Sequence, residues 1–267
     1  MSAPDRILVF IPAYRCAAQI SRVLEQFRDV TVASRFSEIL VIDNRSPDDT
    51  VEAALAKARE LGLGRITIAR NRDNYGLGGS HKAAFLFAAA NAFSHIVVLH
   101  GDDQGRIHDL LPVLERGGHR RMDCCLGARF LWSSRLQGYS VIRILGNLVF
   151  NALFSLASLR PLHDLGSGLN IYRVEPLASR YWMGFYDNLM FNYCMILAHV
   201  ARGDRFMFFP ISWREDDQIS NVKLVSQARR TLALLMRFLG GRKKFLNEDL
   251  RDVRRNAYDF DIIAARL

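Results

Sequence analysis

Residues 97–106, VVLHGDDQGR, bring adjacent carboxylates to the end of an apolar run. Asp102 and Asp103 follow His100 and precede Gln104. Carboxylate and amide oxygens and imidazole nitrogens are ligands of divalent cations, and such a cation can hold a phosphorylated ligand. Gly and Asp are also common turn formers, so an ordinary turn at a strand end is the alternative that this stretch leaves open.

Short apolar runs alternate with helical patterns in the first half of the chain. The pattern predicts helices at 17–27, about 49–61 and 80–93, and strands at 6–12, 38–43, 65–69 and 95–100. Continuous apolar strands between helices are typical of a parallel sheet covered on both faces. Ligands bind such sheets outside the carboxyl ends of the strands. Three polar segments follow predicted strands and should converge on one edge: Pro12-Ala13-Tyr14, Asp43-Asn44 and Asp102-Asp103.

The second half is less regular. Strands are predicted at 123–130, within 164–173 and at 205–213, and helices at 141–159, 188–202 and 222–239. We find no internal repeat and no linker composition. The sequence therefore predicts one α/β domain, residues 1–220, followed by a basic, amphipathic helical extension, residues 221–267.

The net charge of +9 is concentrated in this extension, which has 11 Lys and Arg but 5 Asp and Glu. The excess indicates an anionic partner, unless it is only a solvated helix surface. The extension does not match a known nucleic-acid-binding module, so we expect a membrane rather than nucleic acid. The four cysteines show no CxxC spacing and are predicted to be buried free thiols.

Residues 144–159 form the longest weakly polar stretch. It is shorter than the roughly 20 residues that span a bilayer, and it contains Asn147 and Asn151. We therefore expect an amphipathic helix at a membrane interface rather than a spanning helix. No signal peptide is visible before the first predicted strand.

Seven segments together resemble family 2 glycosyltransferases of the GT-A fold, above all the polyprenyl-phosphate sugar transferases. They occur in the family's order over about residues 6–215: FIPAYRCAAQI, VIDNRSPDDT, RNRDNYGLGGSHKAAF, LHGDDQ, LGARF, DLGSGLNIYR and FFPISWRE. His100 stands where the family has the first Asp of its DxD motif, and Arg15 and Cys16 replace its usual Asn and Glu. The resemblance implies a mostly parallel central sheet with helices on both faces.

The resemblance also implies an inverting transfer of a sugar from a nucleotide-diphosphate sugar to a polyprenyl phosphate. Two alternatives remain open: a transferase that acts on a saccharide hydroxyl, and a catalytically silent nucleotide-binding subunit. A phosphate acceptor needs no strong general base, whereas a hydroxyl acceptor needs one, and Asp164 or Asp187 is the candidate.

On this reading the donor lies at the strand ends. The implied nucleotide-sugar contacts are Pro12, Ala13, Tyr14, Asp43, Gly78, Lys82, Asp102 and Asp103. A Mg²⁺ or Mn²⁺ ion would be held by Asp102, Gln104 and His100, and the imidazole favours Mn²⁺. We weigh Lys82 as a phosphate contact against an ordinary surface lysine on a helix.

The family resemblance also implies which residues bind the acceptor. Arg129, Arg143, Asn147 and Ser167 would bind the acceptor phosphate, because guanidinium groups pair bidentately with phosphate. Asp102, Arg129 and Asp164 are the catalytic candidates. The expected location is the cytoplasmic face of a membrane, bound peripherally to anionic lipid. A membrane-protein partner or a homo-oligomer is also compatible with the sequence.

Overall fold

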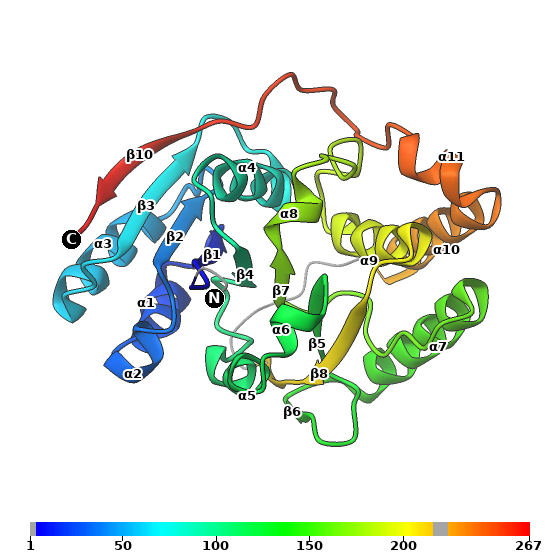
Figure 1. Cartoon of the computed structure of the whole chain (residues 1–267), viewed down its shortest axis with the longest axis horizontal. Helices are drawn as coiled ribbons and strands as arrows, with labels where there is room; N and C mark the ends of the chain where they lie inside the picture. Colours follow the sequence, from blue (N-terminus) through cyan, green and yellow to red (C-terminus); the bar gives the residue numbers. More distant parts are fainter. Residues whose placement is uncertain (1–3, 216–223) are drawn as a thin grey trace.

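The computed structural model describes residues 4–215 and 224–267, and the first two residues of the predicted helix 222–239 lie outside these ranges. Eight strands form one sheet in the order β10-β3-β2-β1-β4-β7-β5-β8, and β6 pairs with β9 beside it (Figure 1). Six strands of the main sheet run parallel, while β7 and β10 run antiparallel to their neighbours. The strand bounds are β1 Ile7–Ala13, β2 Glu38–Asp43, β3 Ile66–Asn71, β4 His95–Leu99, β5 Cys124–Ala128, β6 Arg135–Gln137, β7 Leu169–Arg173, β8 Phe206–Pro210, β9 Ser212–Arg214 and β10 Phe260–Ala265.

Helices cover both faces of the sheet, as predicted. Alternate residues of β1 show this, because Leu8 and Phe10 belong to one buried cluster and Val9 and Ile11 to the other. Both clusters are continuous across the sheet, which explains why its strands are apolar throughout. The helices are α1 Ala17–Glu25, α2 Val30–Ala33, α3 Thr50–Leu61, α4 Gly76–Ala90, α5 Leu111–Glu115, α6 Gly118–Arg121, α7 Val141–Ser158, α8 Val174–Leu177, α9 Met190–Arg202, α10 Leu224–Leu239 and α11 Arg242–Asn247, with a 3-10 turn at Ile107–Leu110.

The C-terminal segment is part of the same folded unit. Leu234 and Phe238 of α10 and Phe245 of α11 are buried in the cluster that covers one face of the sheet. The expectation of a purely helical extension is wrong for its end, because β10 pairs with β3 and becomes the edge strand beyond it (Figure 1). The four cysteines are free and buried, as predicted.

The glycine-rich stretch 76–79 opens helix α4 and packs against protein. A Cβ atom on Gly78 would lie 2.7 Å from the Cβ of Phe191 and would collide with the backbone oxygen of Tyr186. A Cβ on Gly76 would collide with the backbone of Asp187. Gly78 was expected among the nucleotide-sugar contacts, but it packs against the chain just before α9 and at its start.

Lys82 on α4 is neither a surface residue nor open to a phosphate. Its ammonium group is fully buried and donates to Asp187 Oδ1 at 2.7 Å, to the carbonyl oxygen of Phe185 at 2.5 Å and to the hydroxyl of Tyr258 at 3.3 Å. Burial lowers the pKa of Lys82 to about 8, against the opposing effect of Asp187. This cluster joins α4, the segment before α9 and the chain leading to β10.

We predict that Gly78→Ala lowers the free energy of unfolding by about 1–3 kcal/mol, since an added methyl group in a close-packed contact forces the backbone apart. The matched control is Gly146→Ala on α7, where an added Cβ meets no atom within 4 Å. That change should raise stability by about 0.5–1 kcal/mol, because alanine favours a helix over glycine. Urea unfolding of both variants measures the difference, and equal stabilities would contradict the packing role.

Candidate functional site

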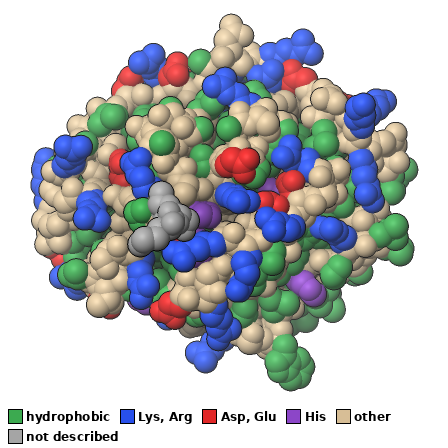
Figure 2. All heavy atoms as spheres, viewed as in Figure 1, with side chains coloured by type: hydrophobic (Ala, Val, Ile, Leu, Met, Phe, Trp, Pro, Cys, Tyr) green, Lys and Arg blue, Asp and Glu red, His purple; other side chains and the backbone are tan. Residues whose placement is uncertain are grey.

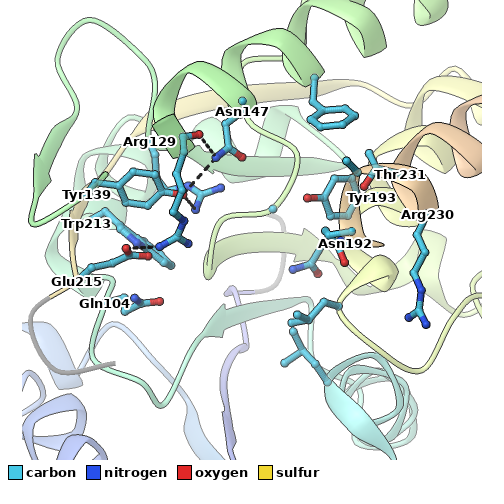
Figure 3. A pocket seen from close by; sticks show the side chains of 18 of the residues that line it. Gln104, Arg129, Tyr139, Asn147, Asn192, Tyr193, Trp213, Glu215, Arg230 and Thr231 are labelled. Atoms are coloured by element: carbon cyan, nitrogen blue, oxygen red, sulfur yellow. Dashed lines mark hydrogen bonds and ion pairs between the residues drawn. The ribbon is translucent and has the colours of Figure 1, made fainter. Parts of the chain in front are cut away.

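A cavity of about 840 Å³ lies beyond the ends of β4 and β5, between α7, α9 and α10 (Figure 3). Arg129, Tyr139, Trp213 and Glu215 are on one side of it, and Asn192, Tyr193, Thr231 and Arg230 are on the other. The cavity therefore has an ionic and aromatic wall facing a wall made largely by α9 and α10.

His100, Asp102 and Gln104 line the cavity where the chain leaves β4. Nδ1 of His100 lies 3.9 Å from Asp102 Oδ2, and the backbone N–H of Gln104 donates to Asp102 Oδ1 at 3.2 Å. Nε2 of His100 is buried without a hydrogen-bond partner in the described chain. Burial and the charge of Arg129 lower the pKa of His100 to about 4, so its imidazole is neutral near pH 7. His100 Nδ1 and Asp102 Oδ2 are therefore two possible metal-ligand atoms beside the same cavity.

These residues fit a cation only in part. Among residues 4–215 and 224–267 no group of three His, Cys, Asp or Glu side chains could hold a metal ion. A Mg²⁺-type ion commonly takes one or two carboxylates and completes its shell with water and substrate phosphates. The geometry therefore fits an ion that arrives with a diphosphate.

Asp103 points away from the cavity. Its backbone is left-handed, with φ of 59°, and its side chain is buried. Asp103 Oδ2 accepts from Arg22 of α1 at 2.6 Å and forms an ion pair with Arg214 of β9. We therefore correct the expectation that Asp103 faces the donor, because two arginines already compensate its charge.

The three predicted strand ends meet. The backbone N–H of Gly101 donates to the carbonyl oxygen of Pro12 at 3.0 Å, and that of Asn44 donates to Ala13 at 2.8 Å. Asp43 is buried and accepts from Arg70 at 2.9 Å and from the N–H of Ser46 at 3.2 Å. Together with the half-exposed Tyr14, these residues lie beside the His100–Asp102 turn but outside the cavity lining.

Arg129 and Asp164 form a buried bidentate ion pair. Nε and Nη2 of Arg129 donate to the two carboxylate oxygens of Asp164, each at 2.8 Å, and the backbone N–H of Arg129 adds a third bond at 2.8 Å. The guanidinium carbon lies 5.1 Å from the ring centre of Trp213. Asp164 also accepts from the N–H of Gly166 at 3.1 Å. Both oxygens of Asp164 are thus engaged within the protein.

Arg143 and Asn147, both predicted to bind the acceptor phosphate, project from α7 into the cavity. Arg143 pairs with Glu215 and lies 4.7 Å from the centre of the Tyr139 ring. Asn147 donates to the Tyr139 hydroxyl at 3.3 Å and to the carbonyl oxygen of Arg143 at 2.7 Å (Figure 3). Ser167, by contrast, is buried, with its hydroxyl 3.3 Å from the carbonyl oxygen of Leu169, and does not line the cavity.

Sequence reasoning missed several lining residues. Tyr139, Trp213 and Glu215 complete the ionic wall, and Tyr193 and Arg230 belong to the opposite wall. Glu215 lies inside the FFPISWRE segment, and Arg230 is one of the basic residues of the extension. Their positions follow from contacts between segments that are far apart in sequence, which no local pattern encodes.

Comparisons with known proteins agree with this architecture. The chain is 26% identical over 176 residues to an undecaprenyl-phosphate mannosyltransferase of Micrococcus luteus, a match that covers 64% of this chain and 68% of that protein. Glucosyl-3-phosphoglycerate synthase from Mycobacterium tuberculosis, solved with phosphoglyceric acid, superposes with a TM-score of 0.62 at 18% identity, covering 88% of this chain and 80% of that one. The same synthase with Mn²⁺ and UDP-glucose gives a TM-score of 0.61 at 18% identity, covering 88% and 79%.

These superpositions confirm the GT-A fold that the sequence predicted. The model of the family described as glycosyl transferase family 2 matches residues 8–180, well over half of the chain, and ends before α9. With the strand-end turn, the cavity and the sheet order in agreement, the chain belongs to glycosyl transferase family 2.

Proposed function

We propose that the protein transfers a sugar, with inversion, from a nucleotide-diphosphate sugar to a polyprenyl phosphate at the cytoplasmic face of a membrane. The proposal rests on one observation: both candidate bases are already engaged by cationic or hydroxyl groups of the protein. Asp164 is held by Arg129, and Asp187 is held by Lys82 and Tyr258. A hydroxyl acceptor would need one of them to take a proton, whereas a phosphate oxygen is already anionic. The Micrococcus luteus relative, named for undecaprenyl phosphate, supports the same acceptor class.

In this proposal the donor diphosphate lies beside His100, Asp102 and Gln104. Asp102 and His100 would hold a divalent metal ion shared with the diphosphate, and Gln104 would lie next to it. When bound, the ion neutralises the charge that develops on the departing nucleotide. Mn²⁺ is the favoured ion, since His100 offers imidazole nitrogen. The structure of the Mycobacterium tuberculosis synthase with Mn²⁺ and UDP-glucose supports this choice.

The chain's own residues then act by positioning. Arg143 presents its guanidinium from α7, Asn147 supports it by donating to the carbonyl oxygen of Arg143, and Arg129 is fixed by Asp164 between the ends of β5 and β7. An acceptor oxygen held here would be aligned with the sugar, and alignment accounts for much of the catalysis in a reaction that needs no proton transfer.

Helix α7 supplies an apolar surface for a membrane. Its outer side chains are exposed over the whole length of the helix: Val141, Ile142, Leu145, Leu148, Val149, Leu153 and Leu156. Figure 2 shows hydrophobic side chains interspersed with Lys and Arg on the face viewed. Among the described residues, α7 is also the one helix that is long and apolar enough to cross a bilayer, by length and composition.

The inner side of α7 favours a helix that lies flat on the membrane. Asn151 donates to the carbonyl oxygen of His163 at 2.7 Å, and Arg143 pairs with Glu215, so both residues are tied to the domain. An exposed apolar outer side on a helix whose inner side is held by the domain is typical of interfacial helices. Helix α10 contributes less apolar surface, because Leu234, Leu235 and Phe238 pack inward. Its exposed apolar side chains are Leu232, Met236 and Leu239.

The reaction itself is the first test. Purified protein is incubated with a panel of nucleotide sugars and Mn²⁺, with polyprenyl phosphate, free polyprenol or no acceptor. We expect nucleoside diphosphate release that depends on polyprenyl phosphate, together with a sugar-phosphate lipid that mild acid cleaves. Transfer to the free alcohol, or to a saccharide in its place, would contradict the proposal.

We predict that Asp102→Asn lowers transfer about a hundredfold, since several kcal/mol of charge stabilisation depend on the metal. Mn²⁺ binding in the presence of nucleoside diphosphate, followed by calorimetry, should weaken as well. Glu52→Gln, an exposed change on α3, is the control for loss of a carboxylate. Unchanged Mn²⁺ binding by the Asp102 variant would exclude this carboxylate as a ligand.

We predict that Leu145→Glu combined with Val149→Glu abolishes flotation with anionic liposomes. The matched control is Val30→Glu on α2, which is equally apolar and exposed but lies at the opposite side of the molecule from α7 (Figure 1). Native protein should float at low salt and less at high salt, because the basic residues are screened. Flotation of the double variant like that of the control would disprove docking through α7.

A further inference from the structure

Helix α10 forms part of the cavity although it lies outside the family match. The match ends at residue 180, yet Gln227, Ala228, Arg230 and Thr231 line the cavity. The helix is anchored there by Leu234 and Phe238, which are buried in the main core. The C-terminal segment is therefore a wall of the site as well as part of the surface.

The arginines that line the cavity differ in whether a nearby carboxylate neutralises their charge. Three arginines line it: Arg129, Arg143 and Arg230. Arg129 is paired with Asp164 and Arg143 with Glu215. Within residues 4–215 and 224–267, Arg230 has no carboxylate or hydrogen-bond partner, and its side chain is exposed. Arg230 is therefore the lining cation whose charge remains uncompensated in the described chain.

Arg230 stands across the cavity from the paired arginine Arg129 (Figure 3). Asn192 and Tyr193 lie on the same side as Arg230, and the donor end, with Gln104, lies on the Arg129 side. A phosphate that enters between α7 and α10 would pass the amide of Asn192 and the hydroxyl of Tyr193, and the exposed Arg230 side chain, which extends away from them in Figure 3, would have to turn toward it. These groups suit a phosphate monoester, since guanidinium binds phosphate through paired N–H donors.

We infer that Arg230 binds the phosphate of the acceptor and that α10 thereby sets the preference for an anionic acceptor. This inference rests on the proposed function, and it adds a binding residue from outside the family match. The ligand class is an isoprenyl phosphate monoester. The donor diphosphate is assigned to the His100–Asp102 end and not to Arg230.

The experiment compares Arg230→Ala, Arg230→Lys and Arg229→Ala. Arg229 is the neighbouring exposed arginine on α10 that does not line the cavity, so it controls for the loss of one basic residue from the helix. Alanine favours helices, so α10 should remain folded, and thermal unfolding checks this. The probes are a water-soluble short-chain isoprenyl phosphate and the alcohol of the same chain length.

We expect Arg230→Ala to raise the acceptor KM about tenfold and to weaken calorimetric binding of the isoprenyl phosphate by the same factor, as for the loss of one charged hydrogen bond. Binding of the alcohol and the donor KM should not change. Arg230→Lys should restore part of the loss, and Arg229→Ala should stay within about twofold of the native protein.

Equal effects of Arg230→Ala and Arg229→Ala would overturn the inference. A rise in donor KM with an unchanged acceptor KM would also overturn it and would place Arg230 at the donor. Failure of the proposed function has a different signature, because the native protein itself would then transfer sugar to another acceptor and not to the isoprenyl phosphate.

Discussion

The ionic wall of the cavity depends on the buried ion pair between Arg129 and Asp164. Two charges taken out of water are costly unless each finds good hydrogen bonds, and here both oxygens of Asp164 accept from Arg129. The pair fixes the end of β5 against the turn before β7, and Trp213 packs on the guanidinium. Removal of either partner would leave an uncompensated buried charge, at a cost of about 3–5 kcal/mol. Because both oxygens of Asp164 are engaged in this pair, its carboxylate is not placed to act as a base, which is the constraint on which the proposed phosphate acceptor rests.

Much of the fold was predictable, because apolar runs and helical periodicity are local properties. The strands that become β1, β2, β3 and β4 were all predicted, and the meeting of their carboxyl ends follows from parallel pairing. What the sequence could not specify is side-chain direction. Asp102 and Asp103 are neighbours of the same type, yet the left-handed backbone of Asp103 turns it toward Arg22 and Arg214, while Asp102 lines the cavity.

The remaining differences come from contacts between distant segments. Lys82 looked like a helix-surface lysine, but its partners Asp187 and Tyr258 lie more than a hundred residues away along the chain. Gly78 was expected to contact the nucleotide sugar, but the chain before α9 and the first turn of α9 pack against it instead. Strand β10 is a short segment after an irregular stretch, and only its antiparallel pairing with β3 makes it a strand. In each case the residue type indicated a special environment, and tertiary structure decided which one.

The three arginines of the cavity form a graded set of cations. Arg129 is buried and cannot leave Asp164 without exposing a charge to a low-dielectric environment. Arg143 is partly exposed, but the Glu215 side chain that pairs with it is largely buried. Arg230 has no anionic partner in the described chain, so among the described residues no ion pair opposes the phosphate contact that we infer for it. The cavity thus combines two arginines that are paired with carboxylates and a third, from the C-terminal segment outside the family match, that has no carboxylate partner in the described chain.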